Sequence, residues 1–176
     1  MADHTIDALS AAVRALDEVI FDAVDPEHPL AREQTRLVSR YLKLLQSRLD
    51  YAYDRNRFEL SHYTDLADGL LADAATLSPA IAAVLGQAVE EGRRLRGLPG
   101  VRAPDLQAAA QRLAAIVTAL IRTAAGAEPA LRRRVETAVL VASKPLLDAQ
   151  RAWFVPQGWE PDPAAVPPIE GAFVLA

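Results

Sequence analysis

Apolar residues recur every three or four positions along most of the chain, which is the spacing of one face of an α-helix. No stretch shows the alternation of β-branched or aromatic residues with polar ones that is typical of strands. Proline and glycine divide the pattern into segments with short connections. We therefore predict an all-α protein, an antiparallel bundle of about five helices with a long second helix and an extended Pro-rich C-terminal tail.

The first two helices are separated by proline. We expect one helix from about Asp3 to Val24, ended by Pro26 and Pro29. The second helix should begin near Leu30 and continue at least to Asp54. It either reaches Leu77 as one rod or bends somewhere between Asp54 and Glu59, and the pattern leaves both alternatives open.

Three further helices are predicted after that point, each opened by a proline. A proline at the first helical position is favourable because its missing N–H has no partner there anyway. The three helices should begin at Pro79 with Ser78 as N-cap, at Pro104, and at Pro129, and end near Leu98, at Gly126 and around Trp153. Pro145 lies inside the last of them and should kink it or split it after Ser143.

The character of the chain changes at Trp153. From there on five prolines alternate with aromatic and aliphatic residues, a composition that disfavours a helix and is costly to leave exposed to water. We expect 1–152 to form the helical bundle and 153–176 to form an extended tail. The tail would pack either on its own bundle or on a partner subunit.

Composition narrows the function classes. The chain has no cysteine, which excludes disulfides, thiolate metal sites and cysteine nucleophiles. Neither a signal-peptide pattern nor an uninterrupted apolar stretch of about 18 residues occurs, so we expect a cytoplasmic protein without a membrane partner.

The second helix carries two apolar stripes. One is an ordinary core stripe that includes Val38 and Leu60, and the other repeats every seven residues from Leu30 to Phe58. Two stripes predict burial on two sides, either as the central helix of a monomer or as the interface of a homodimer. Tyr and Arg beside an apolar seam are typical of interfaces. The interface candidates are Leu37, Tyr41, Leu44, Arg48, Tyr51, Phe58 and Trp159.

The densest polar and aromatic segment lies between Leu49 and Tyr63. Its Glu59-x-x-His62 spacing is half of a di-iron motif, but no second copy occurs and we predict no metal site. No nucleophile elbow or Gly-rich phosphate loop accompanies it, so no cofactor is identified. Whether the protein is an enzyme stays open. The candidates for a ligand pocket are Tyr53, Asn56, Glu59, His62 and Tyr63.

Charge is unevenly distributed in a chain whose net charge is −4. Arginines cluster at 93–102 and at 132–134, at opposite ends of an up-and-down bundle, so a nucleic-acid-binding stripe is not expected. We expect a non-catalytic interaction or assembly protein that self-associates through the second helix, as a homo-oligomer or on a larger protein partner. The alternative is a small-molecule-binding protein or enzyme that uses the ligand pocket.

Overall fold

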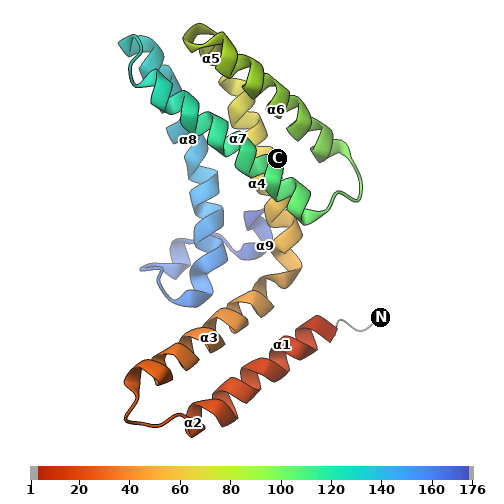
Figure 1. Ribbon diagram of the computed structural model, residues 1–176, viewed down its shortest axis with the longest axis vertical. Coiled ribbons are helices and arrows are strands. Elements are labelled where there is room, and N and C mark those ends of the chain that lie inside the picture. Colours follow the sequence, from red (N-terminus) through yellow and green to blue (C-terminus); the bar gives the residue numbers. More distant parts are fainter. Residues whose placement is uncertain (1–3, 175–176) are drawn as a thin grey trace. The chain divides into compact units, whose positions relative to one another are not determined.

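The computed structural model describes residues 4–174, and all regular elements within that range are helical (Figure 1). The all-α prediction is thereby confirmed. Its helix count is wrong, because seven helices of seven residues or more occur in the described range where about five were expected. They are α1 (His4–Ala15), α3 (Pro29–Arg48), α4 (Ala52–Gly69), α5 (Leu71–Leu77), α6 (Pro79–Gly97), α7 (Ala103–Ala124) and α8 (Pro129–Phe154).

The extra helices come from the segment that was expected to form one long second helix. A 3₁₀ turn, η2 (Leu49–Tyr51), separates α3 from α4, and Leu70 separates α4 from α5. Neither expected alternative is right, since α4 is continuous through 54–69 and the break lies just before it. The first helix also differs in detail, with a π-helical segment η1 (Leu16–Ile20) and a last turn α2 (Phe21–Ala23) after α1. Asp3, its expected first residue, lies outside the described range.

Proline acts differently from expectation in the last third of the chain. Helix α8 runs through Pro145 without a break after Ser143, so a split helix is wrong. Pro145 has no N–H, so the carbonyl of Val141, an exposed residue, receives no helical hydrogen bond from position 145. The tail is not wholly extended, because it contains 3₁₀ turns η3 (Val155–Gln157) and η4 (Pro163–Ala165) and a short helix, α9 (Ile169–Ala172). Pro168 caps α9, a position where proline costs no hydrogen bond.

The chain forms two compact units. The first consists of the residues up to Asp50 together with Trp153–Pro163, and the second of Tyr51–Ala152 together with the residues from Ala164 on. Within 4–174 no helix combines the length and the apolar character needed to cross a bilayer.

The first unit is a helical hairpin in which α1, η1 and α2 lie beside α3 (Figure 1). Polar contacts join its two arms. Asp17 accepts a hydrogen bond of 2.6 Å from the hydroxyl of Ser39 and forms an ion pair of 2.7 Å with Lys43. Both contacts hold the pKa of Asp17 below its ordinary value, the bond to Lys43 most strongly. Leu44 is the one buried apolar side chain between residues 4 and 50.

The second unit holds the hydrophobic core. Helices α4, α6 and α7 pack against one another, and α5 packs on α6. The stripe that the sequence predicts for α7 is confirmed completely, since all six of its members are buried: Leu106, Ala110, Leu113, Val117, Leu120 and Ala124. Local signals set the helix ends as expected, because the Ser78 hydroxyl accepts from the N–H of Ile81 at the start of α6.

Gly92 allows the closest approach between α6 and its neighbours. A Cβ atom at this position would clash with Oγ1 of Thr64 on α4 and would lie 3.4 Å from Cδ1 of Leu113 on α7. Thr64 is fully buried, and its hydroxyl donates a 2.7 Å hydrogen bond to the carbonyl of Leu60. The hydroxyl cannot move aside without losing that bond, so the three helices are fixed at this point.

We predict that Gly92→Ala destabilises the protein by about 1–3 kcal/mol, because overpacking outweighs the better helix propensity of alanine. Urea unfolding followed by circular dichroism measures the change. Gly86→Ala on the same helix is the control, since its Cβ would only meet Leu71 at 3.9 Å, and it should be neutral or stabilising by up to about 1 kcal/mol. Equal effects of the two substitutions would contradict the proposed close contact.

Candidate functional site

Helix α3 leaves most of its apolar side chains in solvent. Leu30 is 73% exposed, Tyr41 48% and Leu45 53%, and Val38 is also exposed. At 100° per residue these residues and the half-buried Leu37 share one side of the helix. We call Leu30, Leu37, Val38, Tyr41 and Leu45 the α3 face. Several large apolar side chains on one helix side are unusual for a surface that stays in water.

The α3 face is exposed because α1 occupies the opposite side of α3. Ser39, Lys43 and Gln46, which lie on that opposite side, contact Asp17 and Ser10. Near the start of α3, the guanidinium groups of Arg32 and Arg36 lie 4.2 and 4.7 Å from the ring centre of Phe21. The hairpin therefore uses its polar side for internal contacts and presents its apolar side outward.

The interface candidates from the sequence differ in how far they are exposed to solvent and in which unit they belong to. Tyr41 and Trp159 are exposed, and Leu37 is half-buried. Leu44 and Arg48 are buried inside the first unit, where Nε of Arg48 donates a 2.9 Å hydrogen bond to the carbonyl of Trp153.

The remaining two interface candidates belong to the second unit. Tyr51 lies near Glu170 and Phe58 packs edge-on against Phe173 with ring centres 5.9 Å apart. The seven-residue stripe is thus interrupted by η2 and does not form one face. Leu30 begins the predicted seven-residue stripe. Val38 and Leu45 were expected on the core stripe, and that prediction is wrong for this part of the helix, because both side chains are exposed.

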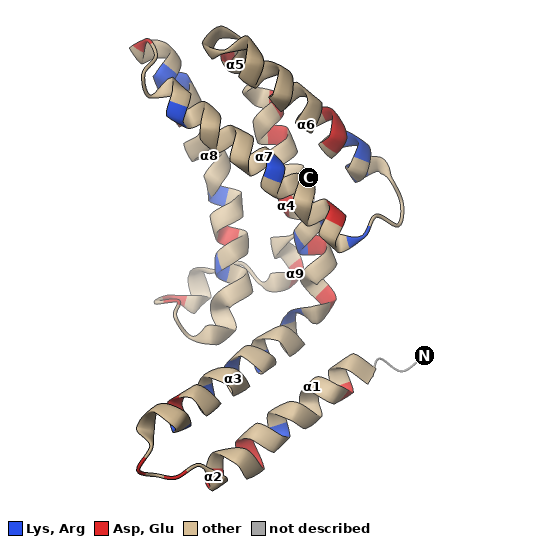
Figure 2. Ribbon diagram, viewed as in Figure 1, with Lys and Arg blue, Asp and Glu red and all other residues tan. Residues whose placement is uncertain are grey.

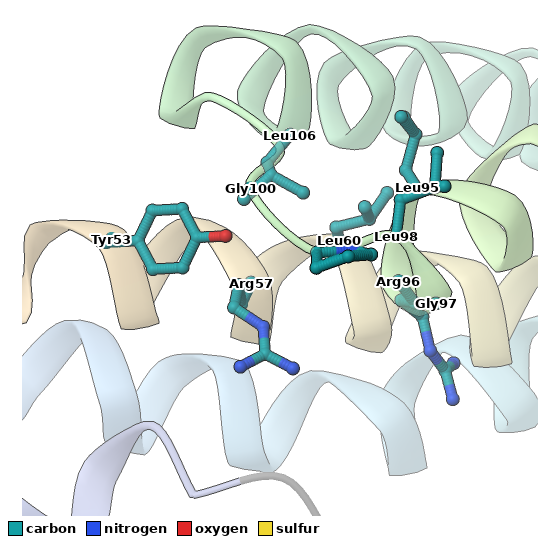
Figure 3. Close-up of a pocket in the computed structure, with 10 residues that line it drawn as sticks. Tyr53, Arg57, Leu60, Leu95, Arg96, Gly97, Leu98, Gly100 and Leu106 are labelled. Atoms are coloured by element: carbon teal, nitrogen blue, oxygen red, sulfur yellow. The ribbon is translucent and has the colours of Figure 1, made fainter.

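One side of α4 lines a pocket of about 360 Å³ in the second unit (Figure 3). Tyr53, Arg57 and Leu60 form its α4 wall, and the end of α6 and the loop Gly97–Gly100 form the other walls. In Figure 3 the Tyr53 hydroxyl points toward the middle of the lining residues, whereas the side chains of Arg57 and Arg96 extend away from Leu106 and Gly100. Gly100 has a φ of +73°, a left-handed conformation that favours glycine and brings the loop back toward α7.

The other side of α4 lines a wider, mostly apolar groove of about 670 Å³, shared with α8. His62 lies in this groove, where its ring stacks near Phe58 and meets the edge of Tyr63, with ring centres 6.3 and 5.3 Å away. Ser61 and Asp65 add polar atoms to the same wall. The residues of α8 that complete the groove are Thr137, Ala138, Val141, Ala142 and Pro145.

The five ligand candidates from the sequence do not line one cavity. Tyr53 faces the pocket and His62 faces the groove. The side-chain amide of Asn56 donates to the carbonyl of Ala52, and Glu59 pairs with Arg55 at 2.9 Å. Tyr63 packs on the imidazole of His62, and burial raises the pKa of its phenol. Arg57 and Arg96 were not identified as candidates, although both line the pocket.

No group of three or more His, Asp or Glu side chains within 4–174 could hold a metal ion. Glu59 and His62 therefore have no further ligand beside them in that range. In the groove, an imidazole surrounded by apolar groups can accept or donate one proton, and Ser61, hydrogen-bonded to Asp65 at 3.3 Å, adds a hydroxyl.

Most arginines near the helix ends are paired with acids, and Figure 2 shows basic and acidic positions next to each other near the end of α6. Arg93 contacts both Asp68 and Glu90, Arg94 contacts Glu91, and Arg102 contacts Asp105. At the start of α8, Arg134 pairs with Asp73 at 2.9 Å. The clusters are thus partly neutralised within the chain, which weakens their attraction for phosphate groups.

We predict that the pKa of His62 lies below that of a free histidine. Burial lowers its pKa, and the nearby charges of Asp65 and Glu59 oppose this shift only partly. Because the unfolded chain binds the proton more readily, stability should fall as pH decreases from about 7 to about 5. NMR titration of the imidazole and urea unfolding across this range measure both effects. His62→Gln should reduce the loss of stability, and His28→Gln, in an exposed turn, should not. An elevated pKa at His62 would contradict this description of the groove.

Comparisons of the chain with models of protein families, with curated proteins and with solved structures found no match.

Proposed function

We propose that this protein is a non-catalytic helical interaction protein that self-associates through the α3 face. The observation that carries the proposal is the exposure of this face, in a hairpin that buries one apolar side chain, Leu44, between residues 4 and 50. Two helices joined mainly by polar contacts gain little free energy from burial. A second apolar surface placed on the α3 face would supply the burial that the hairpin lacks.

A second copy of the chain fits this face in an antiparallel arrangement. If the symmetry axis passes between Leu37 and Val38, those two residues meet across the dimer, because paired residue numbers then add to 75. The same register brings Leu30 opposite Leu45 and Gln34 opposite Tyr41. Apolar residues thus meet apolar residues along most of a helix that is about 30 Å long.

Charged residues beside the α3 face favour the same arrangement. Glu33 and Arg40 lie on one flank of the face, and neither forms an ion pair with any residue from His4 to Val174. In an antiparallel helix pair equal flanks face each other, so Glu33 of one copy lies near Arg40 of the other and the contact occurs twice. A parallel pair would instead place each residue beside its own equivalent at the same height.

We predict that Tyr41→Glu combined with Leu45→Glu converts the protein from a dimer to a monomer. The substitutions place four carboxylates in an interface that must be dehydrated. Sedimentation velocity over a range of concentrations measures the change. Leu147→Glu is the matched control, since Leu147 is an equally exposed leucine on α8 outside the face. The proposal fails if the unmodified protein sediments as a monomer throughout, or if the control dissociates it equally.

We further predict that Glu33→Arg weakens the dimer by about two- to thirty-fold, since two peripheral ion pairs of about 0.2–1 kcal/mol each are lost. Adding Arg40→Glu should restore the affinity because the pair is then reversed. Dimer dissociation constants at low and moderate salt measure both changes. A double variant as weak as the single one would contradict the antiparallel register while leaving self-association itself in place.

A further inference from the structure

We infer that the pocket between α4 and the Gly97–Gly100 loop binds an amphipathic carboxylate, a small molecule with one anionic head and an apolar body. This goes beyond the proposed self-association and does not depend on it, because every lining residue belongs to the second unit. It also differs from the ligand pocket expected from the sequence, with which it shares only Tyr53.

The anionic head is recognised by the polar side chains around the opening. Arg57 is exposed and forms no hydrogen bond or ion pair with any residue between His4 and Val174. Arg96 contacts Asp65 through Nη1 alone, so the rest of its guanidinium group can still donate. Guanidinium groups bind carboxylates through paired hydrogen bonds, and the Tyr53 hydroxyl can add a third donor.

The apolar body is accommodated by the leucines behind these groups. Leu60 and Leu106 belong to the core and form the floor, while Leu95 and Leu98 form the side (Figure 3). A cavity of roughly 150 Å³ is enough for a benzene-sized molecule, so about 360 Å³ holds a longer aliphatic or larger aromatic body. An apolar wall beside a cationic opening is the usual composition of a ligand pocket.

The charge of the pocket selects among ligands. Arg57 carries a positive charge with no acid beside it in the described range, whereas the charge of Arg96 is balanced by Asp65, so the opening favours an anion over a cation. A neutral apolar molecule would leave the charge of Arg57 without a counter-ion. A small inorganic anion would meet the arginines but leave the leucine floor in contact with water. A molecule that satisfies both parts must join an anionic head to an apolar body.

Octanoate is a suitable probe, with 1-octanol and acetate as partial probes that lack the charge or the chain. We expect saturable binding of octanoate by calorimetry, with 1-octanol and acetate at least about tenfold weaker. Backbone NMR shifts should change at Arg57, Leu98 and Gly100. Equal affinity for octanoate and 1-octanol, binding without shifts at these residues, or no saturable binding would overturn the inference.

Two substitutions test the recognition of the head. Arg57→Gln should weaken octanoate binding about tenfold or more, and Tyr53→Phe should weaken it less. Arg122→Gln on α7 is the matched control, because Arg122 is exposed and lies outside the pocket. Circular dichroism verifies that the variants are folded. Unchanged affinity in Arg57→Gln, or an equal loss in Arg122→Gln, would overturn the inference.

Discussion

The contact of Gly92 with Thr64 and Leu113 fixes the arrangement on which the second unit depends. An alanine- and leucine-rich chain with few aromatic residues can fill its interior only if helix backbones approach closely. A residue without a side chain on α6 permits this approach to α4 and α7. The last turn of α6 then lies over α4, so that Leu95 and the following loop face Leu60 and Tyr53. The pocket is a direct consequence of this crossing.

The hairpin of the first unit follows the opposite principle. Its arms are joined by Asp17 with Ser39 and Lys43, by Ser10 with Gln46, and by Arg32 stacked on Phe21. Such contacts between partly solvated groups define geometry more than they stabilise it, because each replaces favourable contacts with water. Apolar burial remains the main source of stability, and the hairpin directs its apolar side away from itself. If the hairpin self-associates as proposed, its folding and that association should be thermodynamically linked.

The sequence predicted most where a repeating pattern coincided with clear end signals. All six residues of the α7 stripe are buried, and the serine cap before Pro79 begins α6 as expected. It failed at Leu49–Tyr51, where α3 and α4 separate without any glycine or proline. The residues there are compatible with both an α-helix and a 3₁₀ turn, so the choice depends on tertiary contacts such as that of Arg48 with the Trp153 carbonyl. A local sequence pattern cannot predict a contact with a residue about a hundred positions away, such as that between Arg48 and Trp153.

The same reasoning explains why the expected ligand site was only partly predicted. Tyr53 and His62 are nine positions apart, and at 100° per residue they point to opposite sides of α4. A cluster that is dense in the sequence is thus spread around the helix, and the residues that share a pocket are those separated by three or four positions, such as Tyr53, Arg57 and Leu60. Arg96, which completes that pocket, comes from a different helix. Polar density along a chain identifies the helix that carries a site, whereas helical phase and packing decide which of its residues act together.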